Sequence, residues 1–540
     1  MFFRVLSFPR KKDKTFRQYL QIVETYREGG KVKQRILLSL GRVDELRASG
    51  ELDRMADALA RLSERQKIVD LVNELVAPAA GMFGPVPVFR HLWKRLCLPA
   101  AIADAVDKET FFAYDMEAAT FRMVLGRLLD PKSKFATHRW AKKVYWDDGE
   151  NVDLQHYYRA LGVLSRNVKR MEENLYFAGR DLFTPAPDLL FFDTTSVYFE
   201  GEGPTGGLGQ YYYSKDNRPD RKQMIVGVVM TREGTPLAHH VFPGNTPDAA
   251  AFSVVIEEMR NRFGIKRVIL IGDRGMFNAT IIKRIEELEM EYIAGVRMRT
   301  VWDVREIVLE DKAPFETVSE NLKVKKVELG GKTYVVCLNE EEARRAKAVR
   351  EQVVAGLREK IAQGPKKLVG HSLYRKYVRL EKDAVSVNEQ KIIDEKKYDG
   401  KYVLLTNTNL SAKETVLAYK GLWQVERAFR EIKSTFEIRP VYLSREDHVR
   451  GHVAICFLAF CLQVAFRKGI EEVKELTDHS FESLLESLKE LRMIELTAGD
   501  KSYRVRTEPD KIATAIFRAV GAPIPRRVTM LEPQPEAAQA

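Results

Sequence analysis

The segment between Leu189 and Arg297 constrains the fold of this chain more than any other stretch. Short apolar runs alternate here with helical patterns in a fixed order. We expect strands at 189–193, 224–230, 236–242, 267–273 and 291–297, with helices at 247–263 and 278–290. Hairpins followed by strand–helix alternation predict an α/β sheet with a mixed edge.

This order is that of the ribonuclease H-like fold, and it places two acids at strand ends. Asp193 closes the first strand and Asp273 closes the fourth, and these strands would be neighbours at the centre of the sheet. In open α/β sheets, ligands collect at strand ends. A carboxylate that follows an apolar run rarely lies there without a partner or a metal. We therefore expect Asp193 and Asp273 to belong to a site.

The stretch from Ser411 to Lys433 predicts a helix with an apolar stripe and a charged stripe. Ser411 and Glu414 form a capping-box pattern. The apolar stripe has helical spacing and consists of Val425, Phe429, Ile432 and Phe436. Tyr419, Glu426 and Lys433 are spaced by seven and line a neighbouring stripe. From this stretch alone, an ordinary amphipathic helix with salt-bridged charges is as good an interpretation as a metal or phosphate site.

Together, Asp193, Asp273 and Glu426 offer the hard oxygen ligands that Mg²⁺ prefers. Two such ions, about 3.5–4 Å apart, activate a nucleophile and stabilise the leaving oxygen of a phosphoryl transfer. Lys433 would then contact a phosphate. The three acids in this element order predict a phosphoryl-transfer site.

The chain is predicted to be multidomain, with α+β and α/β parts. Residues 81–187 read as helices with interleaved basic and aromatic residues, typical of DNA contact. A β-rich insertion interrupts the core, and its conspicuous aromatic is Trp302, which either packs or stacks. The predicted parts are an N-terminal hairpin and helix (1–80), a helical DNA-binding region (81–187), two halves of a ribonuclease H-like core (188–298 and 401–470), the insertion (299–400) and a C-terminal helical and hairpin region that is a candidate for dimerisation (471–540).

Composition narrows the class of partner. The net charge of +12 and the pI of about 9.2 favour a polyanion as partner, either nucleic acid or an acidic membrane surface.

The four cysteines lack the spacing of a zinc site or a disulfide framework. The most apolar run, Val453 to Phe466, is too short to span a bilayer and predicts a buried helix. His448 and His452 share a helical face, but no third metal ligand is evident. We expect a cytoplasmic protein with no membrane partner.

Several segments resemble the DDE transposases of bacterial insertion sequences, in the branch with a β-rich insertion domain. The similar segments are FFDTTSVYFE, FPGNTPDA, IGDRGMFN and the N-terminal hairpin ending in LLSLGR. The signature of that branch is Tyr, two residues, Arg, three residues, Glu, six residues, Lys. Tyr419, Glu426 and Lys433 match it, whereas Leu422 stands at the arginine position. The likeness is greatest to the subgroup named for insertion sequence sixteen-thirty-four.

The resemblance implies cleavage at transposon ends and strand transfer into target DNA, with Mg²⁺ or alternatively Mn²⁺ as cofactor. Asp193, Asp273 and Glu426 would be the catalytic metal ligands. The DNA contacts would be Tyr419 and Lys433, with Arg427 or Arg430 in place of the missing arginine, and Trp302 stacking on a flipped base. The partners would be terminal inverted repeats, target DNA and a second subunit, in a bacterial cytoplasm at the nucleoid. Two alternatives remain at this point: a domesticated, non-cutting DNA-binding protein, and a ribonuclease H-like nuclease.

Overall fold

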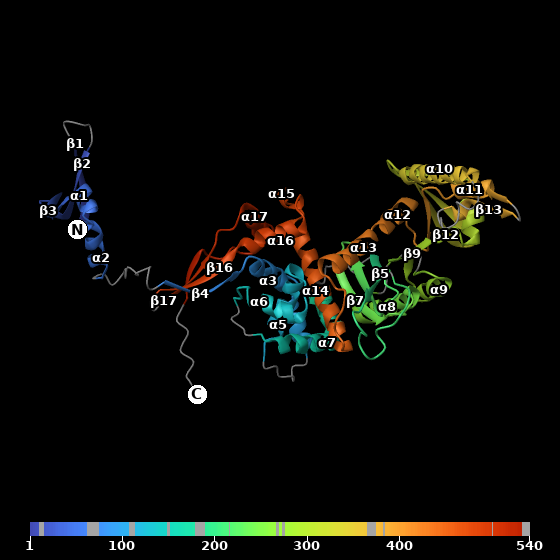
Figure 1. Cartoon of the computed structure of the whole chain (residues 1–540), viewed down its shortest axis with the longest axis horizontal. Helices are drawn as coiled ribbons and strands as arrows, with labels where there is room; N and C mark the ends of the chain where they lie inside the picture. The colour runs from blue at the N-terminus through green and yellow to red at the C-terminus, as the bar shows by residue number, and fades with distance from the viewer. Residues whose placement is uncertain are drawn as a thin grey trace. The chain divides into compact units, whose positions relative to one another are not determined.

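The computed structural model describes most of the chain, and the chain divides into two compact units. The described residues are 1–9, 16–61, 75–106, 114–147, 152–178, 189–214, 217–265, 269–272, 276–363, 374–381, 384–498 and 501–531. The smaller unit comprises Met1–Ala80, Met493–Arg506 and Arg526–Ala540, and the larger unit comprises Gly81–Arg492 and Thr507–Pro525. Figure 1 shows the elements of both units along the chain.

The smaller unit contains two antiparallel sheets. The first has the order β1-β2-β3 and is followed by two helices, with bounds β1 (Phe2–Pro9), β2 (Phe16–Glu28), β3 (Lys31–Arg42), α1 (Val43–Ala48) and α2 (Glu51–Arg61). Gly29 and Gly30 turn the β2–β3 hairpin with φ of 57° and 77°, a region in which glycine carries no steric cost. The predicted N-terminal hairpin is therefore confirmed.

The second sheet of this unit has the order β18-β17-β16-β4, with bounds β4 (Leu75–Met82), β16 (Arg492–Ala498), β17 (Lys501–Arg506) and β18 (Val528–Leu531). The hairpin expected near the C-terminus is β16–β17. Strand β4 contains Pro78 and follows the segment expected to hold only a hairpin and a helix. It is an edge strand, the place in a sheet that tolerates proline.

The larger unit begins with the predicted helices, which pack around one long apolar helix. They are α3 (Pro85–Arg95), α4 (Leu98–Ala105), α5 (Met116–Leu129), α6 (Lys134–Ala141) and α7 (Leu154–Ala178). Helices α3, α5 and α7 contact α14 (Glu446–Ile470). By length and composition α14 passes as a membrane span, but 83% of its most apolar window is buried inside the protein. The run from Val453 to Phe466 is thus a buried helix, as predicted.

A nine-stranded mixed sheet, ordered β10-β11-β12-β15-β9-β8-β5-β6-β7, holds the predicted core strands. Its first part follows the expected element order: β5 (Leu189–Tyr198), β6 (Gln223–Thr231), β7 (Pro236–Pro243), α8 (Asp248–Phe263), β8 (Ile269–Gly272), α9 (Ala279–Glu287) and β9 (Glu291–Val296). β5 pairs antiparallel with β6 and parallel with β8, and β8 pairs parallel with β9. The strand that contains Asp193 and the strand that precedes Asp273 are therefore neighbours, as predicted. The expectation that Asp193 closes its strand is wrong, because β5 continues for five residues to Tyr198.

The segment expected as a separate insertion continues this same sheet. Its elements are η1 (Val304–Val308), β10 (Glu316–Ser319), β11 (Leu322–Leu329), β12 (Lys332–Asn339), α10 (Glu340–Ala362), η3 (Arg375–Tyr377), β13 (Val378–Glu381), β14 (Ala384–Val387) and α11 (Glu389–Lys396). β12 pairs with β15 (Lys401–Thr406), and β15 pairs with β9. Val327 and Val336 belong to the same apolar core as Leu190 and Phe192 of β5.

The single helix predicted from Ser411 to Lys433 is divided in the structure. It consists of α12 (Ala412–Lys420), α13 (Trp423–Arg430) and a π-helical turn, η4 (Glu431–Thr435). The Ser411–Glu414 capping box is present, and the apolar stripe is buried as expected. The interruption lies at Gly421 and Leu422. The chain then continues through α14, α15 (Lys474–Thr477), α16 (Phe481–Glu490) and α17 (Lys511–Val520).

Candidate active site

The two faces of β5 pack against different helices. Phe192 stacks on Phe252 of α8 with ring centroids 5.4 Å apart. Successive side chains of a strand point to opposite faces. Phe191 and Asp193 therefore lie on the face away from α8, and that face is the one covered by α13 (Figure 1).

The segment from α13 to η4 follows β5 along this second face. At its start, a Cβ added to Gly421 would lie 2.4 Å from Cζ of Phe191, so the backbone crosses directly over that ring. Beyond its end, the Val441 amide donates to the Tyr198 carbonyl (3.2 Å), and the Glu200 amide donates to the Val441 carbonyl (2.9 Å). Contacts at both ends align the helical segment with the direction of the strand.

The two predicted acids that the structure describes are both accessible. Asp193 is half-buried, and its Oδ1 accepts a hydrogen bond from the Thr194 amide (2.7 Å). Glu426 is exposed in the first turn of α13, and within the described ranges no hydrogen bond or ion pair engages its carboxylate. Asp273 lies outside the described residues, and no cluster of three metal-ligating side chains occurs among those that are described.

The break in the helix changes how the predicted signature residues are related. Tyr419 lies on α12, where its ring is 6.3 Å from that of Tyr402 on β15. Lys433 lies in η4, half-buried. Tyr419, Glu426 and Lys433 therefore lie on three successive segments, α12, α13 and η4, and the backbone at Gly421 and Leu422 keeps right-handed helical torsions. Leu422, at the position of the family's arginine, is only 7% exposed.

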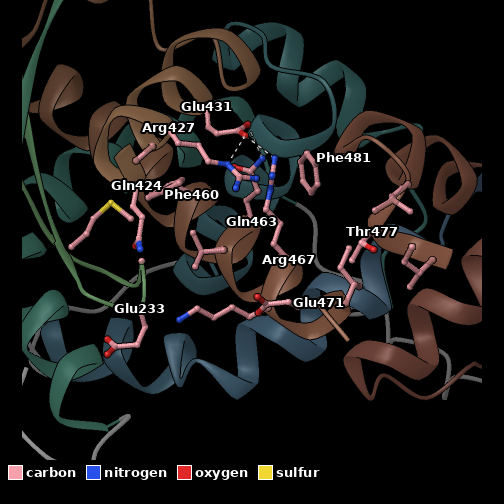
Figure 2. Close-up of a pocket in the computed structure, with 18 of the residues that line it drawn as sticks. Glu233, Gln424, Arg427, Glu431, Phe460, Gln463, Arg467, Glu471, Thr477 and Phe481 are labelled. Carbon is pink, nitrogen blue, oxygen red and sulfur yellow. Dashed lines mark hydrogen bonds and ion pairs between the residues drawn. The ribbon is translucent and has the colours of Figure 1, made fainter. Parts of the chain in front are cut away.

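Arg427 and Arg430 have different surroundings. Arg430 is exposed at the end of α13, whereas Arg427 lines a cavity of ≈ 450 Å³ between α13 and the helices α14 to α16. Figure 2 shows Arg427 and Arg467 converging on Glu431. The Arg467 guanidinium donates to Glu431 Oε1 (2.6 Å), and Arg427 Nε lies 3.9 Å from the same oxygen. Arg427 therefore already has a carboxylate partner in the protein.

Trp302 lies immediately before η1 and is 59% exposed. The simpler interpretation, a tryptophan packed in the core of the insertion, does not match this exposure. The indole remains accessible for a stacking partner.

The basic run of the helical region divides into a buried part and an exposed part. The sequence predicted that the basic residues of the helical region 81–187 contact DNA. Three of them, Arg122, Arg127 and Lys134, are at most 5% exposed, so for these three the prediction is wrong. Arg127 instead donates to the Phe436 carbonyl just after η4 (3.1 Å), which ties α5 to the helical segment that carries Glu426. Other members of the run line a cavity of ≈ 220 Å³: Lys132, Arg139 and Lys143, together with Asp130, Ala136 and Trp140.

His448 and His452 have separate environments. The His452 ring is buried, with Nδ1 3.4 Å from Lys134 Nζ, and burial holds the pKa of His452 well below its usual value. His448 packs on Tyr158 at a centroid distance of 5.6 Å.

A buried ionic network, which the sequence motifs did not predict, joins α7, α8 and β7. Glu172 of α7 accepts a hydrogen bond from Arg262 of α8 (2.7 Å) and lies 2.8 Å from His239 Nδ1 on β7. Burial alone would raise the pKa of Glu172, but His239 and Arg262 outweigh it and hold the pKa below its usual value. The only sequence signal was the pair of histidines, His239 and His240, inside an apolar strand.

Sequence comparisons identify the class of protein. A family model described as the transposase DDE domain matches residues 184–462. A model described as the N-terminal domain of the IS1634 family transposases matches residues 7–71. No curated protein sequence matches the chain.

Two solved structures show partial similarity. A piggyBac transposase synaptic complex with hairpin DNA has a TM-score of 0.37 and 10% identity, covering 75% of this chain and 79% of that one. A Mos1 transposase paired-end complex with the left transposon end has a TM-score of 0.15 and 14% identity, covering 35% and 61%.

The DDE match spans more than half of the chain, which therefore belongs to the DDE transposases, enzymes that cleave DNA and transfer its strands during transposition. Its N-terminal match makes it a transposase of the IS1634 type. The function predicted from the motifs is confirmed.

Proposed function

We propose that Asp193, Asp273 and Glu426 form the metal-binding active site with which this transposase cleaves DNA at transposon ends and joins it to target DNA. The observation that carries the proposal is the course of α13 along β5. It brings the exposed Glu426 to the face and level of the sheet at which Asp193 lies.

The height of each acid along the sheet is estimated from the point at which Gly421 contacts Phe191. A strand rises about 3.3 Å per residue, so Asp193 lies roughly 7 Å beyond Phe191. A helix rises about 1.5 Å per residue, so Glu426 lies roughly 7.5 Å beyond Gly421. Because the two elements run in the same direction, these rises put the two backbone positions at similar heights, which supports the proposal.

The pairing of β8 supports Asp273 as the third acid. Phe191 pairs with Ile271 in the parallel ladder between β5 and β8. Asp193 and Asp273 each follow that pair by two residues in the sequence. The register therefore favours their juxtaposition.

The sheet supports a ribonuclease H-like core. The order β7-β6-β5-β8-β9, with antiparallel hairpins followed by parallel strands, is the arrangement expected for that fold. Strands β10 to β12 and helix α10 would form the β-rich insertion, joined to the core through β15.

The donor set fits a divalent cation. Glu426 and Asp193 are carboxylates with accessible oxygens, the ligand type that Mg²⁺ prefers, with Mn²⁺ as an alternative. When bound, such ions supply an activated nucleophile and stabilisation of the leaving oxygen. The chain's own part is to hold the carboxylates on two rigid elements, with Arg127 and Arg467 fixing the helical segment.

The DNA contacts proposed around this site are Tyr419, Lys433, Arg427, Arg430 and Trp302. The exposure of Arg430 and Trp302 favours them, whereas the ion pair of Arg427 makes it the weaker choice. We further propose that two subunits bring the transposon ends together, with residues 471–540 contributing to the dimer, and that the enzyme acts at the nucleoid.

Conservative substitution tests the three acids. We expect Asp193→Asn, Asp273→Asn and Glu426→Gln each to lower the rate of end cleavage by at least about a thousandfold, because each removes metal-dependent stabilisation worth several kcal/mol. End binding, followed by fluorescence anisotropy, should change by less than about threefold.

Glu51→Gln is a matched control, because Glu51 is also an exposed glutamate in the first turn of a helix. It should leave cleavage unchanged. Cleavage retained by any of the three active-site variants would refute that residue's assignment. End binding without cleavage by the unaltered chain would favour the domesticated, non-cutting alternative.

A further inference from the structure

Three consecutive tyrosines are exposed on the loop between β5 and β6. Tyr211, Tyr212 and Tyr213 are 58%, 52% and 78% exposed. Tyrosine presents a large apolar ring with a polar end, a combination enriched at binding surfaces. Three such rings in a row form an accessible aromatic surface.

The backbone that carries these tyrosines is fixed on both sides. Gln210 and Gln223 exchange backbone hydrogen bonds of 2.9 and 3.0 Å. The buried Gln223 side chain donates to the Tyr213 carbonyl (3.0 Å) and to the Gly244 carbonyl (3.1 Å). The rings therefore project from an ordered support, which reduces the entropy cost of binding a ligand.

The loop lies at the carboxyl end of β5, the strand that carries Asp193. Gly203 and Gly209 pack on the ring of Phe199, where added Cβ atoms would lie 3.1 and 3.5 Å from it. Phe199 also bridges to Val441, which follows η4. The tyrosines are thus presented at the end of the sheet toward which both β5 and the segment bearing Glu426 run.

The charges around the loop favour bases over phosphates as the ligand. Lys222 Nζ lies 6.0 Å from the centroid of the Tyr211 ring. However, Lys222 pairs with Glu202 (3.0 Å), and Arg218 pairs with Asp220 (2.9 Å). Because these cations are already neutralised, attraction of the phosphate backbone is weak here, and ring faces are what the loop offers. Stacking on aromatic rings is how proteins hold single strands without reading sequence.

We propose that Tyr211, Tyr212 and Tyr213 form a stacking surface for unpaired bases of the DNA beside the active site. The proposal rests on the DNA-transposition function and extends the proposed active site. Its ligand is single-stranded DNA at a cleaved end, from either strand.

Binding of DNA ends with and without unpaired bases tests the proposal. The probes are a blunt end duplex and the same duplex with a 3′ or a 5′ single-stranded extension, titrated in Ca²⁺ so that no cleavage is needed. We expect the unaltered chain to bind one extended duplex more tightly than the blunt one. The triple variant Tyr211→Ala, Tyr212→Ala, Tyr213→Ala should bind that duplex at least about tenfold more weakly, the size of one base stack, and should bind the blunt one with unchanged affinity.

The triple change to phenylalanine separates stacking from other effects, because it keeps the rings and should bind within about twofold of the unaltered chain. Tyr213→Ala alone, at the most exposed position, serves if the triple variant folds poorly. Tyr26→Ala is the matched control, an exposed tyrosine that also has a cation near its ring, Arg35 at 5.7 Å.

Equal weakening on blunt and extended duplexes, or no weakening on either, would overturn the stacking surface. So would loss of a dimer in light scattering, which would assign the tyrosines to a second copy of the chain. These readouts do not depend on cleavage, so failure of the three-acid assignment would leave them interpretable.

Discussion

Lys134 is an ionisable group inside the core of the larger unit. It is 4% exposed, and burial, reinforced by nearby Arg127, lowers its pKa from 10.5 to about 7. Between these two values the unfolded chain binds a proton that the folded chain does not. Stability therefore rises with pH from about 7 to 10.5, and the penalty for burying Lys134 is complete below about 7.

Replacing Lys134 by methionine should remove this penalty. We expect Lys134→Met to raise the free energy of unfolding by a few kcal/mol at pH 7, and the gain to be about 2 kcal/mol smaller at pH 9. Urea denaturation followed by tryptophan fluorescence measures both values, since Trp140 lies on the same helix. Lys132→Met, at an exposed position paired with Asp130, should show no such pH trend. A gain that does not vary with pH would mean that Lys134 stays protonated in the folded chain and that burial does not lower its pKa.

The same residue shows a limit of prediction from sequence. Basic residues are almost always exposed, so the run containing Arg122, Arg127 and Lys134 indicated a solvent-facing surface. The buried contacts of Arg127 with Phe436 and of Lys134 with His452 join residues more than three hundred positions apart in the chain. Asp193 was singled out by a local signal, an acid directly after a run of apolar residues, and its assignment to a site stays a prediction.

At the scale of elements, Glu431 holds the helical segment that carries Glu426 to the core. Its carboxylate accepts hydrogen bonds from Arg467 (2.6 Å) and Gln463 (3.0 Å), both on α14. Glu431 begins η4, one turn after Glu426. The two hydrogen bonds from α14 to Glu431 therefore fix the orientation of the segment that carries Glu426, the proposed metal ligand.

We expect Arg467→Met to lower kcat for end cleavage by about tenfold, with end binding within about twofold, because a small displacement of a catalytic group is costly while DNA contacts persist. Combining it with Glu431→Gln should give less than the product of the two effects. Arg284→Met is the control, since Arg284 also joins two helices through an ion pair, with Glu257 at 3.1 Å. Additive effects, or weaker binding alone, would contradict the positioning role.

The helical segment also separates what the sequence could predict from what it could not. The capping box and the buried stripe follow from local spacing, and both are present. The need for glycine at position 421 does not, because it comes from the ring of Phe191 on a strand 230 residues earlier in the chain.

At the scale of the whole chain, the order of strands from β5 to β9 was predictable because each connection is local. The extension of this sheet by β10, β11 and β12 was not predictable. β10 to β12 join the sheet only through β15, and a pairing between distant strands leaves no periodic signal in the sequence. The domain bounds expected for residues 299–400 therefore mark a separate segment of the chain within a shared sheet and a shared apolar core.

The charge of the chain also acts at this scale. A protein of net charge +12 that binds DNA through its phosphates releases counterions from the DNA. Its affinity for DNA should therefore fall steeply as the salt concentration rises. We expect end binding to weaken at least about a hundredfold between 50 and 200 mM salt, as for about four or more phosphate contacts. Arg139→Gln with Lys143→Gln should lower the slope of log K against log salt by about 1 for each phosphate that the variant no longer neutralises. Arg345→Gln, whose guanidinium pairs with Glu342 at 3.1 Å, should leave the slope unchanged. An affinity that does not change with salt would mean that contacts to bases and to DNA shape, rather than to phosphates, dominate DNA binding.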